Sequence, residues 1–474
     1  MSITLTQDVA HKEMPVGTDW VFTINSTNVG GNYKFKYIAD LYISAIPGGL
    51  PAYSIRLKFS PNSTGVGMIS LSDILEQYVS SDNLGFAGSP YDCSFKGAAP
   101  NLLTAPPIHC IDKLSLNSNN IQNLTIKWGE EYSVNSTDAP TIYADELVSD
   151  DYLLWNGVAY NNEQELVGAE YGINITDWNN SNYIMNSITS KMLTDTQAGS
   201  NVSTGQLIGD NDYATLSFLS GKFSSGHSKP DAYTIQFFDS DNVFISGVTT
   251  SIIPANGGYD STTDTGLVNS NFHLQYIGVG TANMLGAGIT IPSNWDFYII
   301  YLTDGVSVVS TPYQYHRKGA DCKGFETIRL TWLNKFGVWD YYNFTKKNTR
   351  ATDIKRTEFN SVKGNWNGST FTKYGFERGR GVLNTSATET MSLNSDWFTN
   401  DEEAAWIEQL FISPEVYILG GYDATDTAPA DYGKYMTPVM ITNKSFDRYT
   451  RANDKVAQYE VDIEYSINKR IQRA

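Results

Sequence analysis

The stretch from Phe325 to Phe344 restricts what this chain can fold into more than any other part of the sequence. Apolar and polar residues alternate from 328 to 332, and this period of two predicts a strand with one buried and one solvated face. Residues 334–337 then supply a turn, because Asn and Gly tolerate the positive φ that a tight turn requires. A second strand follows from 338 to 344, so we expect a β-hairpin.

Aromatic residues crowd this hairpin, and cross-strand aromatic pairs commonly hold such a ribbon rigid. None of its side chains belongs to a pattern that is typical of catalysis. We therefore assign the hairpin, together with one tryptophan of a predicted helix, a structural or interaction role. The residues concerned are Trp332, Asn334, Gly337, Trp339, Tyr341, Tyr342 and Trp406.

The size and charge of the chain limit its domain count and its partners. At 474 residues it exceeds what one hydrophobic core sustains, so two to four domains are expected. The formal net charge of −18 argues against nucleic acid and anionic lipid as main partners. No window approaches the roughly 18 consecutive apolar residues of a membrane span, so we expect no membrane insertion.

Turn-forming residues separate short strand patterns at intervals of about 8 to 12 residues, the spacing typical of a sandwich or jelly roll. We therefore predict a mainly β, multi-domain fold, β-sandwich or jelly-roll-like, with a few short packed helices. Three domains are expected. They are 1–150 with one helix, 151–312 as a β-sandwich insertion, and 313–474 with the aromatic hairpin and one capped helix.

Two helices and several strands are distinct enough to place. Residues Leu71–Val79 carry one apolar stripe at helical spacing, and Thr399–Ile412 opens with a Thr399/Glu402 capping box. Strands at Tyr33–Ser44 and Ser54–Phe59 are expected to pair, and Asp239–Asn242 is expected to be a hairpin turn. Further strands are predicted at 214–219, 233–238, 243–248, 272–277, 295–302, 416–419, 438–442 and 458–465.

The cysteines favour a reducing compartment. Residues 1–17 show no basic region followed by an apolar run, so no secretory signal is expected. The three cysteines, Cys93, Cys110 and Cys322, are too few for a disulfide scaffold. Separate thiols are the preferred interpretation, with a Cys93–Cys110 bridge as the alternative.

No reaction centre stands out in the sequence. The five histidines are scattered singly, which disfavours a zinc site. Gly278-Val279-Gly280 and Gly379-Arg380-Gly381 lack the setting of a phosphate loop, and we expect both to be plain loops. Asp239–Asn242 and Asp423–Asp431 could bind calcium but lack the twelve-residue ligand order, so solvated turns are preferred. We predict no catalytic, cofactor-binding or metal-binding residue, and no enzyme.

Several sequence motifs carry a resemblance to a known class of proteins. They are Tyr37-Ile38-Ala39-Asp40-Leu41-Tyr42, the segment from Arg56 to Pro61 with the helix after it, the hairpin from Thr331 to Gly337, and the closing strand Gln458–Tyr465. In these the chain resembles virion structural proteins of tailed bacteriophages, and is most similar to the tail or baseplate type of marine and Bacteroidetes phages. The likeness covers the first 80 and the last 160 residues.

This resemblance implies a protein that is made in the host bacterial cytoplasm and assembles with other virion proteins, its flanking regions docking on the tail. From it we expect a non-enzymatic tail, baseplate or tail-hub-associated protein that forms a symmetric homo-oligomer, because exposed β edges are commonly completed by neighbours. Two alternatives stay open. One is a receptor-binding module in which residues 152–312 bind host surface glycan, and the other is a polysaccharide depolymerase with a carboxylate pair.

Overall fold

The computed structural model confirms a mainly β protein, because 52% of the residues that it describes are in strands and 9% are in helices. It describes residues 2–9, 12–44, 52–81, 120–159, 164–169, 172–178, 182–196, 198–199, 206–219, 230, 232–251, 274–286, 288–319, 324–377, 379–398, 401–420, 436–447 and 457–467. The chain divides into two compact units. Unit 1 is Met1–Lys318, Leu333–Tyr341 and Gly421–Tyr435, and unit 2 is Gly319–Trp332, Tyr342–Gly420 and Met436–Ala474.

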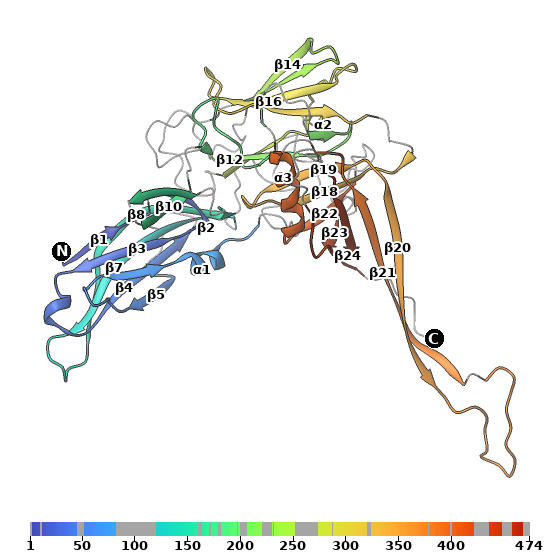
Figure 1. Ribbon diagram of the computed structural model, residues 1–474, viewed down its shortest axis with the longest axis horizontal. Coiled ribbons are helices and arrows are strands. Elements are labelled where there is room, and N and C mark those ends of the chain that lie inside the picture. Colours follow the sequence, from blue (N-terminus) through green and yellow to red (C-terminus); the bar gives the residue numbers. More distant parts are fainter. Residues whose placement is uncertain are drawn as a thin grey trace. The chain divides into compact units, whose positions relative to one another are not determined.

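Two sheets form the beginning of unit 1 (Figure 1). The smaller has the order β1-β3-β6, and the larger has the order β2-β8-β7-β4-β5, with β2 and β8 parallel and its other pairs antiparallel. Their strands are β1 (Ile3–Gln7), β2 (Glu13–Gly17), β3 (Val21–Ser26), β4 (Tyr33–Ser44), β5 (Ile55–Phe59), β6 (Gly67–Ser70), β7 (Ile121–Ser133) and β8 (Thr141–Val158). The predicted strand Tyr33–Ser44 and its pairing with the next strand are confirmed.

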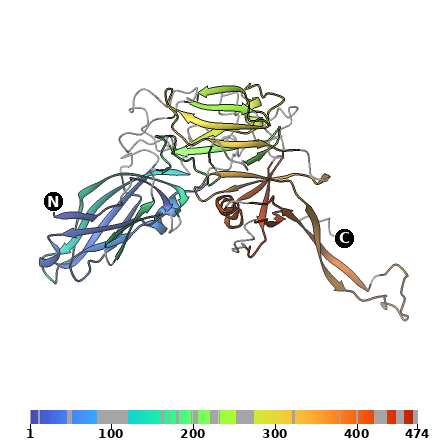
Figure 2. The ribbon, with the colours of Figure 1, turned by 45° about the horizontal axis from the view of Figure 1, so that its top comes forward.

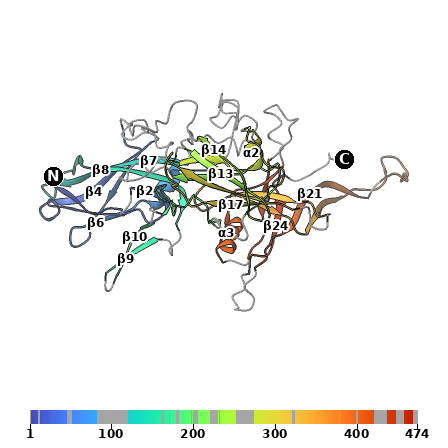
Figure 3. The same cartoon turned by 90° about the horizontal axis from the view of Figure 1, so that it is seen from above.

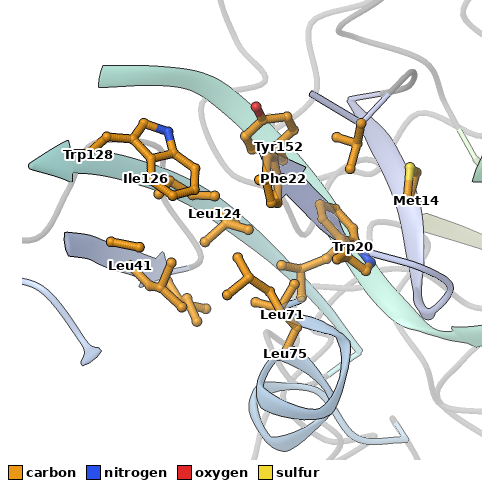
Figure 4. Packing of buried hydrophobic residues seen from close by; sticks show 14 of the residues in the cluster. Met14, Trp20, Phe22, Leu41, Leu71, Leu75, Leu124, Ile126, Trp128 and Tyr152 are labelled. Atoms are coloured by element: carbon orange, nitrogen blue, oxygen red, sulfur yellow. The ribbon is translucent and has the colours of Figure 1, made fainter. Parts of the chain in front are cut away.

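The core of these two sheets is rich in aromatic side chains (Figure 4). Trp20 meets Tyr152 edge-on with ring centroids 6.0 Å apart, and Phe22 lies 5.6 Å from Trp128. Tyr152 belongs to β8, which therefore runs through the domain boundary predicted near residue 150. The division into three domains stays a prediction.

The first predicted helix is shorter and less regular than its apolar stripe suggests. It consists of α1 (Ser72–Leu75) and a 3-10 turn, η2 (Glu76–Tyr78), while Leu71 and Leu75 lie buried in the core. Ser72 does not cap this helix, because its hydroxyl donates to the Thr18 carbonyl (2.7 Å) and accepts the Trp20 N–H (3.1 Å). The stripe thus identified the buried face correctly but not the full length of regular helix.

The middle of unit 1 contains three further sheets. The largest has the order β11-β17-β16-β13-β14, and the two small ones are β12-β15 and β9-β10. Strands β9 and β10 are seen side by side in Figure 3. The elements are β9 (Gln164–Ala169), β10 (Gly172–Trp178), β11 (Gln206–Ile208), β12 (Thr215–Leu219), β13 (Ala232–Phe238), β14 (Phe244–Ser251), β15 (Leu274–Gly278), α2 (Thr281–Gly286), β16 (Phe297–Thr303) and β17 (Tyr313–Arg317). The structure has a strand at each of the five places predicted in this region. Of the strand predicted at 272–277, the residues from 274 on are described.

Unit 2 is built on most of a seven-stranded sheet with the order β19-β18-β22-β23-β24-β21-β20, in which Leu333 of β18 and Trp339–Tyr341 of β19 are assigned to unit 1. Its elements are β18 (Ile328–Leu333), β19 (Trp339–Phe344), β20 (Asn348–Asn360), β21 (Arg380–Asn394), α3 (Asp401–Ile412), β22 (Val416–Leu419), β23 (Met436–Ile441) and β24 (Glu460–Tyr465). Helix α3 buries Trp406, Ile407 and Leu410 in the same core as the sheet. The helix is therefore confirmed from Asp401, while Thr399 of the predicted capping box lies outside the described residues.

The long pair β20–β21 was not predicted. Thirteen residues of β20 pair antiparallel with β21, and only Thr390–Asn394 of β21 pair also with β24. The remaining ribbon extends beyond the sheet as two strands, which Figures 1 and 2 show as a long hairpin. Residues 379–381, which we expected to form a plain loop, include the beginning of β21 at Arg380, so that prediction was wrong for Arg380 and Gly381.

The five-stranded sheet of unit 1 that contains β13 buries the phenol of Tyr233. Loss of the phenol proton should change the free energy of unfolding. Tyr233 on β13 is 3% exposed and lies between Thr250 of β14 and Leu302 of β16. Burial raises the pKa of Tyr233 to about 12, against a smaller lowering effect of its hydrogen bond with Thr250. The neutral phenol is thus favoured by the fold up to a higher pH than in an unfolded chain.

We expect this group to make the free energy of unfolding fall as pH rises from about 10 to 12. The unfolded chain loses the proton near pH 10 while the folded chain keeps it, so the fall is about 1.4 kcal/mol per pH unit. Urea denaturation at a series of pH values should show a shallower dependence for Tyr233→Phe than for the wild type. Equal dependence in the two proteins would contradict the prediction.

Candidate functional site

The side chain of Asn334 organises the turn of the hairpin. Its Oδ1 accepts hydrogen bonds from the N–H groups of Phe336 (2.9 Å) and Val338 (3.2 Å). The backbone closes the same turn, because the Asn334 N–H donates to the Val338 carbonyl (2.8 Å). The turn predicted at 334–337 is therefore confirmed, but Asn334 makes it by accepting N–H groups and not by a positive φ of its own.

The same amide also holds a polar cluster in unit 1. Its Nδ2 donates to the Leu193 carbonyl (2.9 Å) and to Oδ2 of Asp340 (3.0 Å), whose Oδ1 accepts a hydrogen bond from the Thr194 hydroxyl (2.8 Å). Asn334 and Asp340 are both buried. Buried polar groups are stable only when they are paired, so this cluster fixes the turn against residues 193 and 194.

Gly337 sits where no side chain fits. Its φ is +73°, and a Cβ placed on it would lie 1.6 Å from the Asn156 carbonyl oxygen. The Gly337 carbonyl accepts a hydrogen bond from Asn120 Nδ2 (2.8 Å), and the carbonyl of Lys335 accepts one from the Val158 N–H (2.6 Å). The turn is thus pressed against the backbone near residue 156.

The five aromatic residues predicted to have a structural or interaction role are all buried. In unit 2, Trp332 packs against Trp406 with ring centroids 5.2 Å apart, and Tyr342 meets Trp406 edge-on at 6.0 Å. In unit 1, Tyr341 shares a hydrogen bond of 2.8 Å with the Thr215 hydroxyl. Trp339 is also buried. The structure gives these side chains contacts within one copy, and a role for them between copies stays a prediction.

Tyr342 shows how tightly this part of unit 2 is closed to water. Its hydroxyl donates to Asp396 Oδ2 (3.2 Å) and accepts the Asp396 N–H (3.0 Å). Burial raises the pKa of Tyr342 well above its ordinary value, and the nearby Asp396 carboxylate raises it further. The phenol therefore acts as a neutral structural link.

Two buried carboxylates, those of Glu130 and Asp40, are occupied by donors from the surrounding fold. Glu130 accepts hydrogen bonds from Ser2 (3.0 Å), Ser26 (2.6 Å) and Asn28, and Asp40 forms a bidentate pair with Arg56 at 2.6 Å. Such pairing explains their burial without a reaction.

The described residues contain no group of three His, Cys, Asp or Glu side chains that could hold a metal ion. Asp239–Asn242 forms the predicted hairpin turn, in which Asp239 accepts the N–H groups of Asp241 (3.0 Å) and Val243 (2.9 Å). Asp423–Asp431 and the three cysteines lie outside the described part. No helix in the described part is long and apolar enough to cross a membrane.

The β20–β21 ribbon is the surface that the sequence did not reveal. We call residues 352–389 the β-arm, because from the pair Thr352–Glu389 outward the two strands pair with each other and no longer with β24. No residue of β20 is buried. The arm tip, residues 361–379, carries exposed aromatic side chains at Trp366, Phe371, Tyr374 and Phe376.

Comparisons with known proteins leave the family of this chain open. No protein-family model matches it, and no curated protein matches its sequence. Solved structures of Escherichia coli alpha-2-macroglobulin align at 6–7% identity with a TM-score of 0.18, covering 83% and 97% of this chain and 22% and 24% of theirs. A Salmonella alpha-2-macroglobulin mutant aligns at 6% identity with a TM-score of 0.19, over 100% of this chain and 30% of the other. The chain thus spans less than a third of these proteins.

Gly337→Ala should destabilise the protein much more than Gly324→Ala. Both glycines have nearly the same φ, +73° and +76°, so both substitutions cost roughly 1–2 kcal/mol for the left-handed backbone. Only at Gly337 does the new Cβ also collide with backbone, since nothing lies within 4 Å of the position at Gly324. Urea denaturation should show a loss at Gly337 that exceeds the loss at Gly324 by about 2 kcal/mol or more. Equal losses would mean that the close approach at Asn156 is absent.

Proposed function

We propose that this chain is a non-enzymatic structural protein of a bacteriophage tail, of the tail or baseplate type, which works as a symmetric homo-oligomer. The observation that carries the proposal is the β-arm. A two-stranded ribbon without a covering layer is marginally stable in water, and three or more strands or a packing partner are normally needed. A long exposed ribbon therefore suits a protein whose surface is completed by assembly.

The distribution of buried polar groups supports the same proposal. Glu130, Asp40 and Asp340 are each engaged by donors from the surrounding fold, as hydrogen-bonded supports of strands and turns. A catalytic acid or base would instead face a cleft that substrate can enter. The role as part of a virion rests on the sequence resemblance described above.

The full chain should form an oligomer of fixed copy number. Analytical ultracentrifugation over a concentration series gives the mass of the assembly, and class averages from electron microscopy should show rotational symmetry. Antibodies against the chain should label the tails of the phage that encodes it. A chain that stays monomeric at every concentration and is missing from purified particles would overturn the proposal, and release of sugar from host polysaccharide would overturn its non-enzymatic part.

A second candidate function is binding of host surface glycan by the middle region. The observation that favours it is an aromatic cluster beside the Asp239–Asn242 turn. Phe238 stacks on Phe297 with centroids 4.9 Å apart, and Phe244, 5.9 Å from Phe238, is exposed. Flat apolar rings of this kind can stack on sugar rings.

If the middle region binds glycan, Phe244→Ala should weaken binding of the full chain on a glycan array by about tenfold, equivalent to about 1.4 kcal/mol. Trp397→Ala, which removes an exposed aromatic ring outside both the middle region and the β-arm, is the control and should leave binding unchanged. Absence of binding by the wild type, or equal loss in both variants, would remove this candidate.

A further inference from the structure

The β-arm is built to reach away from the sheet that carries it. Its two-stranded part runs from the pair Thr352–Glu389 to the pair Asn360–Arg380, which is nine residues of β20. At about 3.3 Å per residue this part alone is roughly 30 Å long. A compact domain of about 100 residues has a radius of gyration of about 13 Å, so the arm can cross a neighbouring domain.

The tip carries the kind of side chains that anchor protein interfaces. Phe376 is 82% exposed and stacks on Tyr374 with ring centroids 5.5 Å apart, while Trp366 is 60% exposed. Aromatic residues are enriched at the centres of protein interfaces and dominate their binding energy. Several of them gathered on one short exposed hairpin end mark a docking element.

The net charge of the β-arm is opposite in sign to the net charge of the whole chain. Residues 352–389 contain six Lys and Arg against four Asp and Glu, a net charge of +2, in a chain whose total is −18. Unit 1 contains 15 Lys and Arg against 34 Asp and Glu, a net charge of −19, whereas unit 2 contains 18 against 17 and is nearly neutral. The acidic charge of this protein is therefore concentrated in unit 1, and a cationic arm is electrostatically complementary to it.

A nucleic acid or an anionic lipid fits the arm less well than an acidic protein does. Two net positive charges on 38 residues are few for neutralising phosphates, and Arg380 is already paired with Glu358. Exposed rings on a weakly cationic ribbon instead suit a protein surface that is acidic at its rim and apolar at its centre.

We propose that the arm tip of one copy docks on unit 1 of a second copy of this chain. Trp366 and Phe376 supply the apolar anchor, and Lys363 and Lys373 face acidic side chains of the second copy. This inference rests on the proposed function, because it names the element through which the homo-oligomer forms. Passed from copy to copy, one such contact per chain generates a ring if the rotation between copies closes.

The test removes the anchor and measures the oligomer. Wild type, the double variant Trp366→Ala/Phe376→Ala and the control Trp397→Ala are compared as full chains by analytical ultracentrifugation. Trp397 is a matched control, because it is also 60% exposed and lies outside the arm. The double variant should raise the dissociation constant of the oligomer about 100-fold or more, and the control should change it less than about threefold. Unchanged circular dichroism shows that each variant is folded.

The outcomes separate this inference from the proposed function. If the wild type assembles and the double variant assembles equally well, the arm proposal is overturned while oligomeric function stands. If the wild type never assembles, both are overturned. Binding of glycan that depends on Trp366, with an unchanged oligomer, would also overturn the arm proposal and assign the tip to a carbohydrate.

Two further measurements locate the contact and its charge. Benzoylphenylalanine introduced in place of Phe376 should crosslink, on illumination, to peptides of unit 1, and mixing isotopically light and heavy chains should show that the link joins two copies. Crosslinks confined to one chain, or to unit 2, would contradict the proposal. Lys373→Glu should weaken the oligomer several-fold at low ionic strength and less at high ionic strength.

Discussion

The hydrogen bonds of one buried amide, that of Asn334, join the hairpin turn to a distant segment of unit 1. The oxygen of this amide satisfies two backbone N–H groups of the turn, and its nitrogen satisfies the Leu193 carbonyl and Asp340. Leaving a buried donor or acceptor unpaired costs about 1–3 kcal/mol, so the loss of this side chain would be felt at several groups together. A turn residue thereby fixes a segment that lies 141 positions away along the chain.

Charge is the second constraint that runs through the molecule. Unit 1 carries all of the net negative charge, and the β-arm has an excess of two basic residues. Like charge between copies opposes contacts of unit 1 with unit 1, whereas contact of the arm with unit 1 is attractive. Under the proposed assembly, repulsion therefore excludes wrong pairings while attraction selects the right one.

Alternating residues located several strands but missed both the mostly buried strand β2 and the exposed strand β20. The solvated face predicted for residues 328–332 was wrong, because every residue of β18 is buried. Tyr33–Ser44 and the closing strand have one buried face, and their alternating residues located them, with identical bounds for β4. Both faces of β20 are exposed to solvent, so apolar and polar residues do not alternate along it and no strand was predicted there. Asn334 and Gly337 were likewise found from their turn chemistry. Their partners at Leu193 and Asn156 could not be found, because only the fold brings those distant residues beside the turn.

The isolation of the β-arm has a consequence for how the protein can change over generations. From the pair Thr352–Glu389 to the tip, the ribbon does not pair with β24, the strand that joins it to the sheet, so replacements there leave the buried core of the sheet untouched. Selection can then alter what the tip recognises without first repairing a loss of folding stability. Where recognition and packing use the same buried side chains, that freedom does not exist.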